Sequence, residues 1–396
     1  MSFKKKNMIV LLGAMFLMFI LLTGIAAAKE IDDVLKDLKG VRGLDVEALV
    51  YVDYSAGQTP LAGNNKKSYN QFGLTRGYLT VKKKIQPWMT ARATLDIHQD
   101  ATGQYNERLK YLYAELKPGD KGFLTNMKAE IGLGHIPWFD FEEDINLYRM
   151  QGTMAIERGG VLNSADNGAS IRGYFGGRLT NSMKTVGNHH YDGRFGSWHV
   201  GVYNGAGYHG KEQNNNKVVE GRLTLRPLPD AVPGLQFTYF GVFGEGNTMQ
   251  GTDYPDYTVN LGMLSFQNPR IVLTAQYIRT EGNKDGTWVD ANNDALKTAA
   301  YSFFGDLRLP VMDDKLSVIL RYDHFDADKN DKIASDTAYD MFFAGLAYQV
   351  YKGNRLIAVY ESTDYGSDSA GKGKAPVAAT NLGDDHKVQV VWQIKY

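Results

Sequence analysis

The sequence predicts an all-β protein, an antiparallel transmembrane β-barrel of about 16 strands over residues 44–396. Three features support this prediction: segments with a hydrophobic period of two, an alternation of short turns with long loops, and an amphipathic C-terminal segment. A period of two gives an extended strand one apolar and one polar face. In a membrane barrel the apolar face meets lipid and the polar face encloses water.

The chain begins with a segment that has the features of a secretory signal peptide. Lysines at positions 4–6 precede an apolar stretch over residues 8–25, and Ala26-Ala27-Ala28 gives a small-residue cleavage pattern. This pattern predicts that residues 1–28 are removed on export. A retained membrane anchor is the alternative, because the apolar stretch has a marginal length for a span. Residues 29–43, with apolar residues at helical spacing, predict a short periplasmic helical or linker segment.

The composition excludes several classes of protein. The chain of 396 residues contains no cysteine, which excludes disulfides, zinc–thiolate sites and covalently attached haem. Basic and acidic residues are equal at 44 each, and loss of the three leader lysines leaves a net charge of −3. Nucleic acid is therefore not an expected partner. The 24 tyrosines, 18 phenylalanines and 43 glycines suit many strands with tight turns and aromatic belts.

The strands are predicted in order by their alternation. In residues 88–98, for example, Ala93 and Leu95 face one way while Arg92 and Asp96 face the other. Each predicted strand is long enough to cross a bilayer when tilted. The predicted strands cover residues 44–54, 74–84, 88–98, 107–117, 125–135, 166–178, 195–204, 219–227, 234–244, 256–267, 269–280, 299–309, 315–323, 338–350, 354–362 and 384–396.

The connections between these strands are of two kinds that alternate. Short ones such as "KPGDKG" and "PVMDD" are rich in the residues that tight turns require. Long polar ones include "AGQTPLAGNNKKS" (56–68) and "DADKNDKIASD" (326–336). Short turns on one rim and long loops on the other are typical of outer-membrane barrels. The connection over residues 179–194 breaks the alternation, which indicates a missed hairpin or an unusual periplasmic turn.

The C-terminal segment, residues 384–396, alternates almost strictly and ends on Tyr396. Its apolar face would meet a second sheet in a soluble sandwich or lipid in a barrel. The alternating turns favour the barrel, and an even number of strands places both chain ends at the periplasmic rim. A final strand that closes on an aromatic residue resembles the signal by which barrel proteins are recognised for insertion.

The longest connection, residues 136–166, follows the fifth predicted strand and is expected to carry function. Its aromatic and aliphatic residues would fix it to the inner wall, so we expect it to fold into the lumen as a long third external loop. Its charged residues would then face a narrowed pore and filter solutes by charge. The alternative is a loop that lies over the outer mouth with solvated charges. The constriction residues predicted in this way are Asp140, Glu142, Glu143, Asp144, Arg149, Glu157 and Arg158.

Basic residues on the polar faces of the strands are candidates for a pore lining that favours anions. The alternative is that each is an ordinary wall residue paired with a carboxylate such as Asp96, Glu130 or Asp323. The predicted pore-lining residues are Arg76, Arg92, Lys110, Arg172, Arg222, Arg226, Arg308 and Arg321.

No pattern in the chain indicates an enzyme or a bound cofactor. His189 and His190 have no cysteine or helical H-x-x-x-H partner that would indicate a metal site. The carboxylates of "FEED" (141–144) lack the spacing of a calcium loop, and no nucleophile motif accompanies them. We therefore expect no catalytic residues, metal or cofactor.

Three segments of the sequence are similar to one known family. They are "LTRGYLTVKKKIQPWMTARATLDIH" (74–98), "IGLGHIPWFDFEED" (131–144) and the run from "WHVGVYNGAGYHG" to "FTYFGVFGEGN" (198–247). They resemble the phosphate-selective porin O/P family. The resemblance implies a 16-stranded, usually trimeric outer-membrane porin that passes anions through a ladder and a constriction of basic residues. Acidic residues at 142–144 depart from that pattern, so we expect a general or weakly anion-preferring porin, with phosphate or other anions among its solutes.

Two other functions remain open at this stage. The barrel could be the sheath of an electron conduit, with a multihaem cytochrome as its partner, because the chain itself has no cysteine for haem. It could also be a specific channel for a sugar or a carboxylate, in which tyrosine and tryptophan side chains would line the sugar path.

Overall fold

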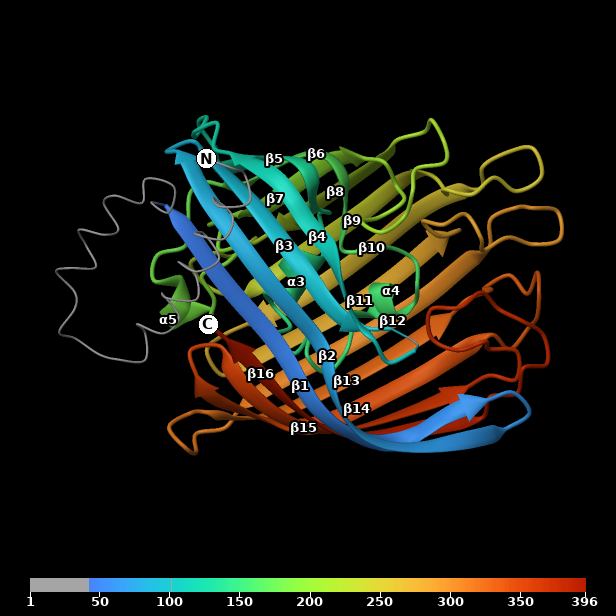
Figure 1. Ribbon diagram of the computed structural model, residues 1–396. Coiled ribbons are helices and arrows are strands. Elements are labelled where there is room, and N and C mark those ends of the chain that lie inside the picture. The colour runs from blue at the N-terminus through green and yellow to red at the C-terminus, as the bar shows by residue number, and fades with distance from the viewer. Residues whose placement is uncertain (1–42, 101) are drawn as a thin grey trace, which may run out of the picture. The chain divides into compact units, whose positions relative to one another are not determined.

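A computed structural model describes residues 43–100 and 102–396 (Figure 1). The predicted signal peptide, residues 1–28, and nearly all of the predicted 29–43 segment lie outside the described residues. Within the described ranges, no helix has the length and apolar character needed to cross a membrane. The compact unit considered below is Val46–Tyr396.

Sixteen strands make up this unit, in agreement with the predicted number. They are β1 (Leu44–Leu61), β2 (Asn65–Gln86), β3 (Met89–Gln99), β4 (Tyr105–Leu116), β5 (Leu124–His135), β6 (Ala165–Phe175), β7 (Gly196–Tyr203), β8 (Val218–Leu225), β9 (Leu235–Glu245), β10 (Asp256–Gln267), β11 (Ile271–Glu281), β12 (Lys297–Arg308), β13 (Leu316–Asp326), β14 (Ala338–Tyr351), β15 (Asn354–Tyr365) and β16 (Asp384–Lys395).

The strands form one closed barrel in which each pairs with its neighbours in sequence and β16 returns to β1. The closing ladder is antiparallel and runs from Leu49 opposite Lys395 to Gly57 opposite Lys387. Inside this seam, the side-chain amide of Gln389 donates to Asp53 at 3.0 Å across 336 positions of sequence. Closure leaves no free sheet edge, which a β-structure in lipid requires.

The side-chain faces of β8 show how the barrel is oriented. Its outward residues Val219, Leu223 and Leu225 are 50%, 44% and 48% exposed, while the inward Arg222 and Thr224 are buried. This is the reverse of a soluble protein, in which apolar side chains are buried and polar ones are exposed. An apolar outer surface over all strands is the arrangement expected of a barrel that spans a membrane.

The first hairpin differs from its prediction. Residues 56–68 were expected to be a long external loop, yet β1 continues to Leu61 and β2 begins at Asn65, so only residues 62–64 connect them. The polar composition of this stretch suits a loop or a strand that extends into water equally well, and the β1–β16 ladder supplies pairing partners up to Gly57. Alternation alone therefore predicted the end of β1 too early and the start of β2 too late.

The connection between β6 and β7, which broke the expected alternation, is an unusual turn rather than a missed hairpin. It contains the short helix α5 (Ser182–Thr185) and an isolated bridge between Arg178 and Gly193. Figure 1 shows α5 at the same end of the barrel as the C-terminus, which is the rim of the short turns. Val186 in this connection is 3% exposed, so the segment packs against the barrel.

Candidate functional site

The loop between β5 and β6 folds into the barrel, as predicted, and carries the short helices α3 (Phe139–Glu143) and α4 (Ala155–Arg158) (Figure 1). Trp138, Phe141 and Met150 in this loop are completely buried. The Trp138 ring stacks on Phe240 of β9 with 5.3 Å between the ring centroids. Burial of a large aromatic side chain is worth roughly 1.5–3 kcal/mol, so several together hold the loop inside.

The inner wall that the loop covers is apolar, which the alternation did not predict. In β10, Val259 and Leu261 face inward and are completely buried, while Asn260 and Gly262 face outward. Ile278 of β11 also faces inward and is completely buried. Water would not fill this side of the lumen favourably, because exposed apolar surface costs about 25 cal/mol per Å². The loop and this wall therefore form one hydrophobic core, and the polar interior lies on the other side.

Glu142 and Arg158, two of the predicted constriction residues, are buried between the loop and the wall. Glu142 accepts hydrogen bonds from Trp138 Nε1 at 2.6 Å and from Gln276 Nε2 of β11 at 2.5 Å. Burial raises the pKa of Glu142 to about 7. Arg158 lies 3.6 Å from Asp323 of β13, so its charge is compensated inside the core. These contacts attach the loop to β11 and β13. The two side chains therefore point into the core and not into the cavity of the lumen.

Three other predicted loop residues form an ion-pair group of their own. Arg149 donates to Glu143 at 2.9 Å and lies 3.2 Å from Glu157. Both acids are only part-buried, with side chains 30% and 15% exposed, and Arg149 interacts electrostatically with Tyr51 of β1 and Tyr78 of β2. The group places one guanidinium between two carboxylates and leaves one negative charge.

Most of the predicted basic wall residues are paired or covered. Arg76 binds Asp96 at 2.8 Å, and Arg321 binds Asp323 at 2.6 Å beneath the loop. Arg222 is buried under the loop, where its guanidinium lies 4.1 Å from the centre of the Phe141 ring. The last two residues lie near the short-turn rim: Arg226 donates to the carbonyl of Gly193, and Arg308 ends β12.

Arg92 and Lys110 are each held against a tyrosine ring, and neither contacts a carboxylate within the described residues. The Arg92 guanidinium lies 4.7 Å from the centre of the Tyr111 ring, and Lys110 Nζ lies 4.5 Å from that of Tyr78. A register shift in the β3–β4 ladder explains the Lys110 position. Thr94 pairs with Tyr111 but the next residue pairs with Leu109, so β4 has a bulge at Lys110. Bulges redirect side chains in this way.

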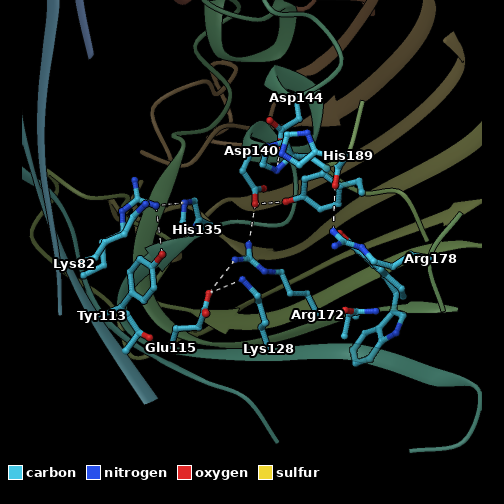
Figure 2. A pocket seen from close by; sticks show the side chains of 18 residues that line it. Lys82, Tyr113, Glu115, Lys128, His135, Asp140, Asp144, Arg172, Arg178 and His189 are labelled. Carbon is cyan, nitrogen blue, oxygen red and sulfur yellow. Dashed lines mark hydrogen bonds and ion pairs between the residues drawn. The ribbon is translucent and has the colours of Figure 1, made fainter. Parts of the chain in front are cut away.

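A cavity of about 590 Å³ lies between the loop and the inner wall of β2–β7. Figure 2 shows Asp140 and Asp144 at one side of it and Tyr113, Glu115 and Lys128 at the other. Of the predicted site residues, Arg92, Arg172, Asp140 and Asp144 line this cavity. The other predicted site residues do not line this cavity.

Arg172 connects the wall to the loop inside this cavity. Its guanidinium binds Glu130 of β5 and Asp140 of α3, each at 2.8 Å. Asp140 also accepts a hydrogen bond from the Tyr191 hydroxyl of the β6–β7 connection. Arg172 therefore fixes the position of α3 relative to the wall and has no free charge to offer.

The sequence analysis did not identify the part that the β6–β7 connection has in this cavity. Asn188 donates to the backbone carbonyl of Asp144 at 2.7 Å, and the Tyr191 ring packs edge-on against Phe141 at 5.2 Å. The connection thus supports the loop from the short-turn rim. Its unexpected length was the one signal in the sequence that could have indicated this.

Comparisons with known proteins support the fold. No protein-family model matches the chain, and no curated protein matches it. An anion-selective porin from Comamonas acidovorans is 12% identical with a TM-score of 0.57, and the match covers 89% of this chain and all of that one. OmpF of Salmonella typhi, in a complex with daunomycin, is 13% identical with a TM-score of 0.57, and the match covers 89% and 97% of the two chains.

A third similar structure is OmpT of Vibrio cholerae, an outer-membrane protein in its trimer form. It is 12% identical with a TM-score of 0.54, and the match covers 89% of this chain and 100% of that chain. At such identities the likeness concerns the fold. The class of protein that the strands and the inward loop define is a 16-stranded antiparallel β-barrel of the outer-membrane porin type.

Proposed function

We propose that this chain is an outer-membrane porin that forms a water-filled diffusion channel for small hydrophilic solutes. The observation that carries this proposal is a charged cavity of about 590 Å³ inside a closed barrel whose outer surface is apolar. An inward loop that narrows such a lumen would exclude large solutes and leave a path for small ones. The resemblance to porins of known structure supports the same function.

A weak preference for anions is part of the proposal. Arg92 and Lys110 are inner-wall cations held against tyrosine rings, and neither has a carboxylate partner among the described residues. Arg92 lines the cavity, while Lys110 is buried behind it at 6% exposure; cations beside a narrow water path raise the local concentration of anions. The carboxylates of the loop would keep this preference small, and phosphate or other anions would be among the solutes.

The inward loop supports a channel over the sheath of a cytochrome conduit. Its completely buried residues fill the side of the lumen next to β9–β15, and a multihaem cytochrome would need that space. No specific observation favours the sheath, and none favours a sugar path lined by aromatic residues.

The proposal includes outer-membrane location and a homotrimer. The apolar outer surface requires lipid, and one similar structure is a trimer form. Mass determination of the detergent-purified protein by light scattering would test the trimer, with a monomeric mass as the contrary result.

Planar-bilayer recording of the purified protein in asymmetric KCl tests the channel. We expect an ohmic conductance and a reversal potential whose sign indicates chloride preference, reduced in the variant that combines Arg92→Gln with Lys110→Gln. Arg270→Gln at the rim is the matched control, since Arg270 is exposed and pairs with Asp314 at 3.3 Å. Absence of conductance from protein that still shows heat-modifiable mobility would refute the channel.

A further inference from the structure

The connection between β13 and β14 matches most of the residue pattern of a calcium-binding loop. Residues 326–337 read "DADKNDKIASDT". In the calcium loop of EF-hand proteins, side-chain oxygens come from the first, third and fifth positions, which here are Asp326, Asp328 and Asn330. The last position differs, because Thr337 stands where those loops have glutamate. No metal was expected from the sequence, because the calcium pattern was sought at residues 141–144 and not here.

The backbone of this loop has the sharp turn that the pattern requires. Asp331 stands at the sixth position, where EF-hand loops have glycine, and has a φ of 53°. Few residues other than glycine adopt this left-handed conformation, with Asn and Asp the commonest among them. The Asp331 backbone N–H donates to the carbonyl of Asp328 at 3.0 Å. The Asp331 side chain is exposed and has no partner within the described residues, so it is a turn residue and not a ligand.

Asp328 is the residue that points to a bound cation. It is completely buried, and its Oδ1 has no hydrogen-bond partner within the described residues. Its Oδ2 accepts from the backbone N–H groups of Ile333 and Ala334, which fixes the carboxylate in place. No basic side chain of the described ranges forms an ion pair with Asp328. Aspartate is almost never fully buried without a positive partner, because removal of its charge from water costs several kcal/mol.

Asp326 lies within reach of the same ion. Its Oδ1 accepts from the Asp328 backbone N–H at 3.2 Å and from the Thr337 hydroxyl at 2.8 Å. One carboxylate is thus held against the backbone of the residue that carries the other. A calcium ion, with bonds to oxygen of about 2.3–2.6 Å, can contact both. The Asp326 Oδ2 atom has no hydrogen bond within the described residues, so it is free to bind a cation.

The donor atoms define the kind of metal. Among the described residues, no group of three or more His, Cys, Asp and Glu side chains surrounds one metal position. The loop offers two carboxylates, the Asn330 amide oxygen and backbone carbonyls, which are hard oxygen donors that suit Ca²⁺ rather than Zn²⁺ or Cu²⁺. Without a glutamate at the last position, we expect the affinity of an extracellular calcium module, with a Kd on the order of 10⁻⁴–10⁻³ M.

We infer that the β13–β14 loop is a calcium-binding site. Asp326 and Asp328 each bind the ion through one carboxylate oxygen, and Asn330 binds it through its side-chain carbonyl. The loop belongs to the rim of the long connections, at the end of the barrel opposite the C-terminus (Figure 1). In the proposed outer-membrane location this rim meets the external medium. Calcium binding is independent of solute passage, so the detergent-purified full chain is sufficient for the test.

Two measurements on the wild-type protein test the site. Calorimetric titration with CaCl₂ after EGTA treatment should show one ion bound per chain. Trypsin reports the state of the loop, because Lys329 and Lys332 are exposed on it. We expect cleavage after these two lysines, identified by mass spectrometry, to slow several-fold in millimolar CaCl₂. MgCl₂ should protect less, because Mg²⁺ requires a near-ideal octahedral shell and gives up its water reluctantly.

Asp328→Asn and Asp331→Asn are a matched pair, because they make the same chemical change in the same loop. Asp328→Asn is expected to weaken calcium binding at least tenfold and to remove the protection from trypsin. Asp331→Asn is expected to retain both, because asparagine also adopts the left-handed conformation and the Asp331 side chain contacts nothing. Heat-modifiable mobility of each variant shows that its barrel is folded.

The contrary outcomes are specific to the loop. Absence of both a binding signal and protection in the wild-type protein at millimolar Ca²⁺ would overturn the site. Equal calcium binding by the wild-type protein and Asp328→Asn would do so as well, as would equal loss of binding in the two variants. The proposed channel is tested separately by its conductance, which none of these results affects.

Discussion

Asp144 shows how one residue is set apart by the pairing of its neighbours. Arg172 and Arg149 bind Asp140 and Glu143 beside it, and Asp144 has no arginine or lysine partner within the described residues. Burial, with the carboxylates of Asp140 and Glu143, raises the pKa of Asp144 to about 8. Its charge is therefore expected to change within a range of pH that a bilayer experiment can cover.

The ion preference of the channel should depend on pH through Asp144. Below its pKa the carboxyl is neutral and Arg92 and Lys110 act unopposed; above it the negative charge offsets them. We expect the preference for chloride to fall as the pH rises from about 6 to about 9, measured as the reversal potential in asymmetric KCl. Asp144→Asn should keep the low-pH preference throughout. A preference that rises with pH would contradict this assignment.

Glu142 should affect stability rather than selectivity. Its pKa is about 7 in the folded state, above the ordinary value of 4.5, so the folded protein holds this proton more tightly. Protonated Glu142 therefore contributes to the free energy of unfolding below about pH 4.5. This contribution, about 3 kcal/mol at most, is lost as the pH rises towards 7. Glu142→Gln keeps a neutral group there and should flatten the profile, measured by denaturant unfolding in detergent between pH 4 and 8. Equal pH profiles for both proteins would contradict it.

At the scale of elements, the inward loop is the feature that sets the size of the lumen. Trp138, wedged between Phe141 and Phe240, is the largest side chain among those that are completely buried. Its indole N–H also holds the Glu142 carboxylate. Removal of this ring would loosen the loop from β9 and β11 while leaving the strand ladders unchanged.

Trp138→Ala should therefore widen the channel. A large-to-small change in a core costs about 3–5 kcal/mol. Here it weakens the attachment of the loop and leaves the barrel strands stable. We expect a higher and noisier single-channel conductance together with unchanged heat-modifiable mobility. Trp88→Ala in the β2–β3 turn, where the ring is 54% exposed, is the matched control. An unchanged conductance in Trp138→Ala would show that the loop does not restrict the path.

Sequence periodicity located the strands and the inward loop but did not resolve which charges remain free. The strand pattern follows from one face meeting lipid, and that constraint acts at every strand. The position of Lys110 depends on a bulge, and the lack of a basic partner for Asp144 depends on pairs formed between distant segments, neither of which has a local pattern. The apolar inner faces of β10 and β11 broke the simple rule because the loop covers them.

At the scale of the whole molecule, an apolar outer face has to tolerate lipid along its full height. Leu320 faces outward near the middle of β13 and is 46% exposed. Val311 is equally exposed at 47% but lies in the turn between β12 and β13. The two positions have the same exposure and different surroundings.

Leu320→Arg should destabilise the barrel by about 2–4 kcal/mol, the cost of arginine at the middle of a bilayer. Val311→Arg should cost close to nothing, because a turn at the rim is hydrated. Guanidinium titration of each protein in phospholipid vesicles, followed by tryptophan fluorescence, measures the difference. Equal destabilisation by the two substitutions would contradict the assignment of the outer face to lipid.

The seam between β1 and β16 has a consequence for biogenesis. Fifteen of the ladders join strands that are neighbours in sequence, whereas the contact between Asp53 and Gln389 spans 336 positions. Hairpins can therefore form as synthesis proceeds, but the cylinder cannot shut until its last strand meets its first. Pairing between such distant segments is slow. The unclosed chain therefore needs a chaperone that covers the apolar faces of its strands until β1 pairs with β16.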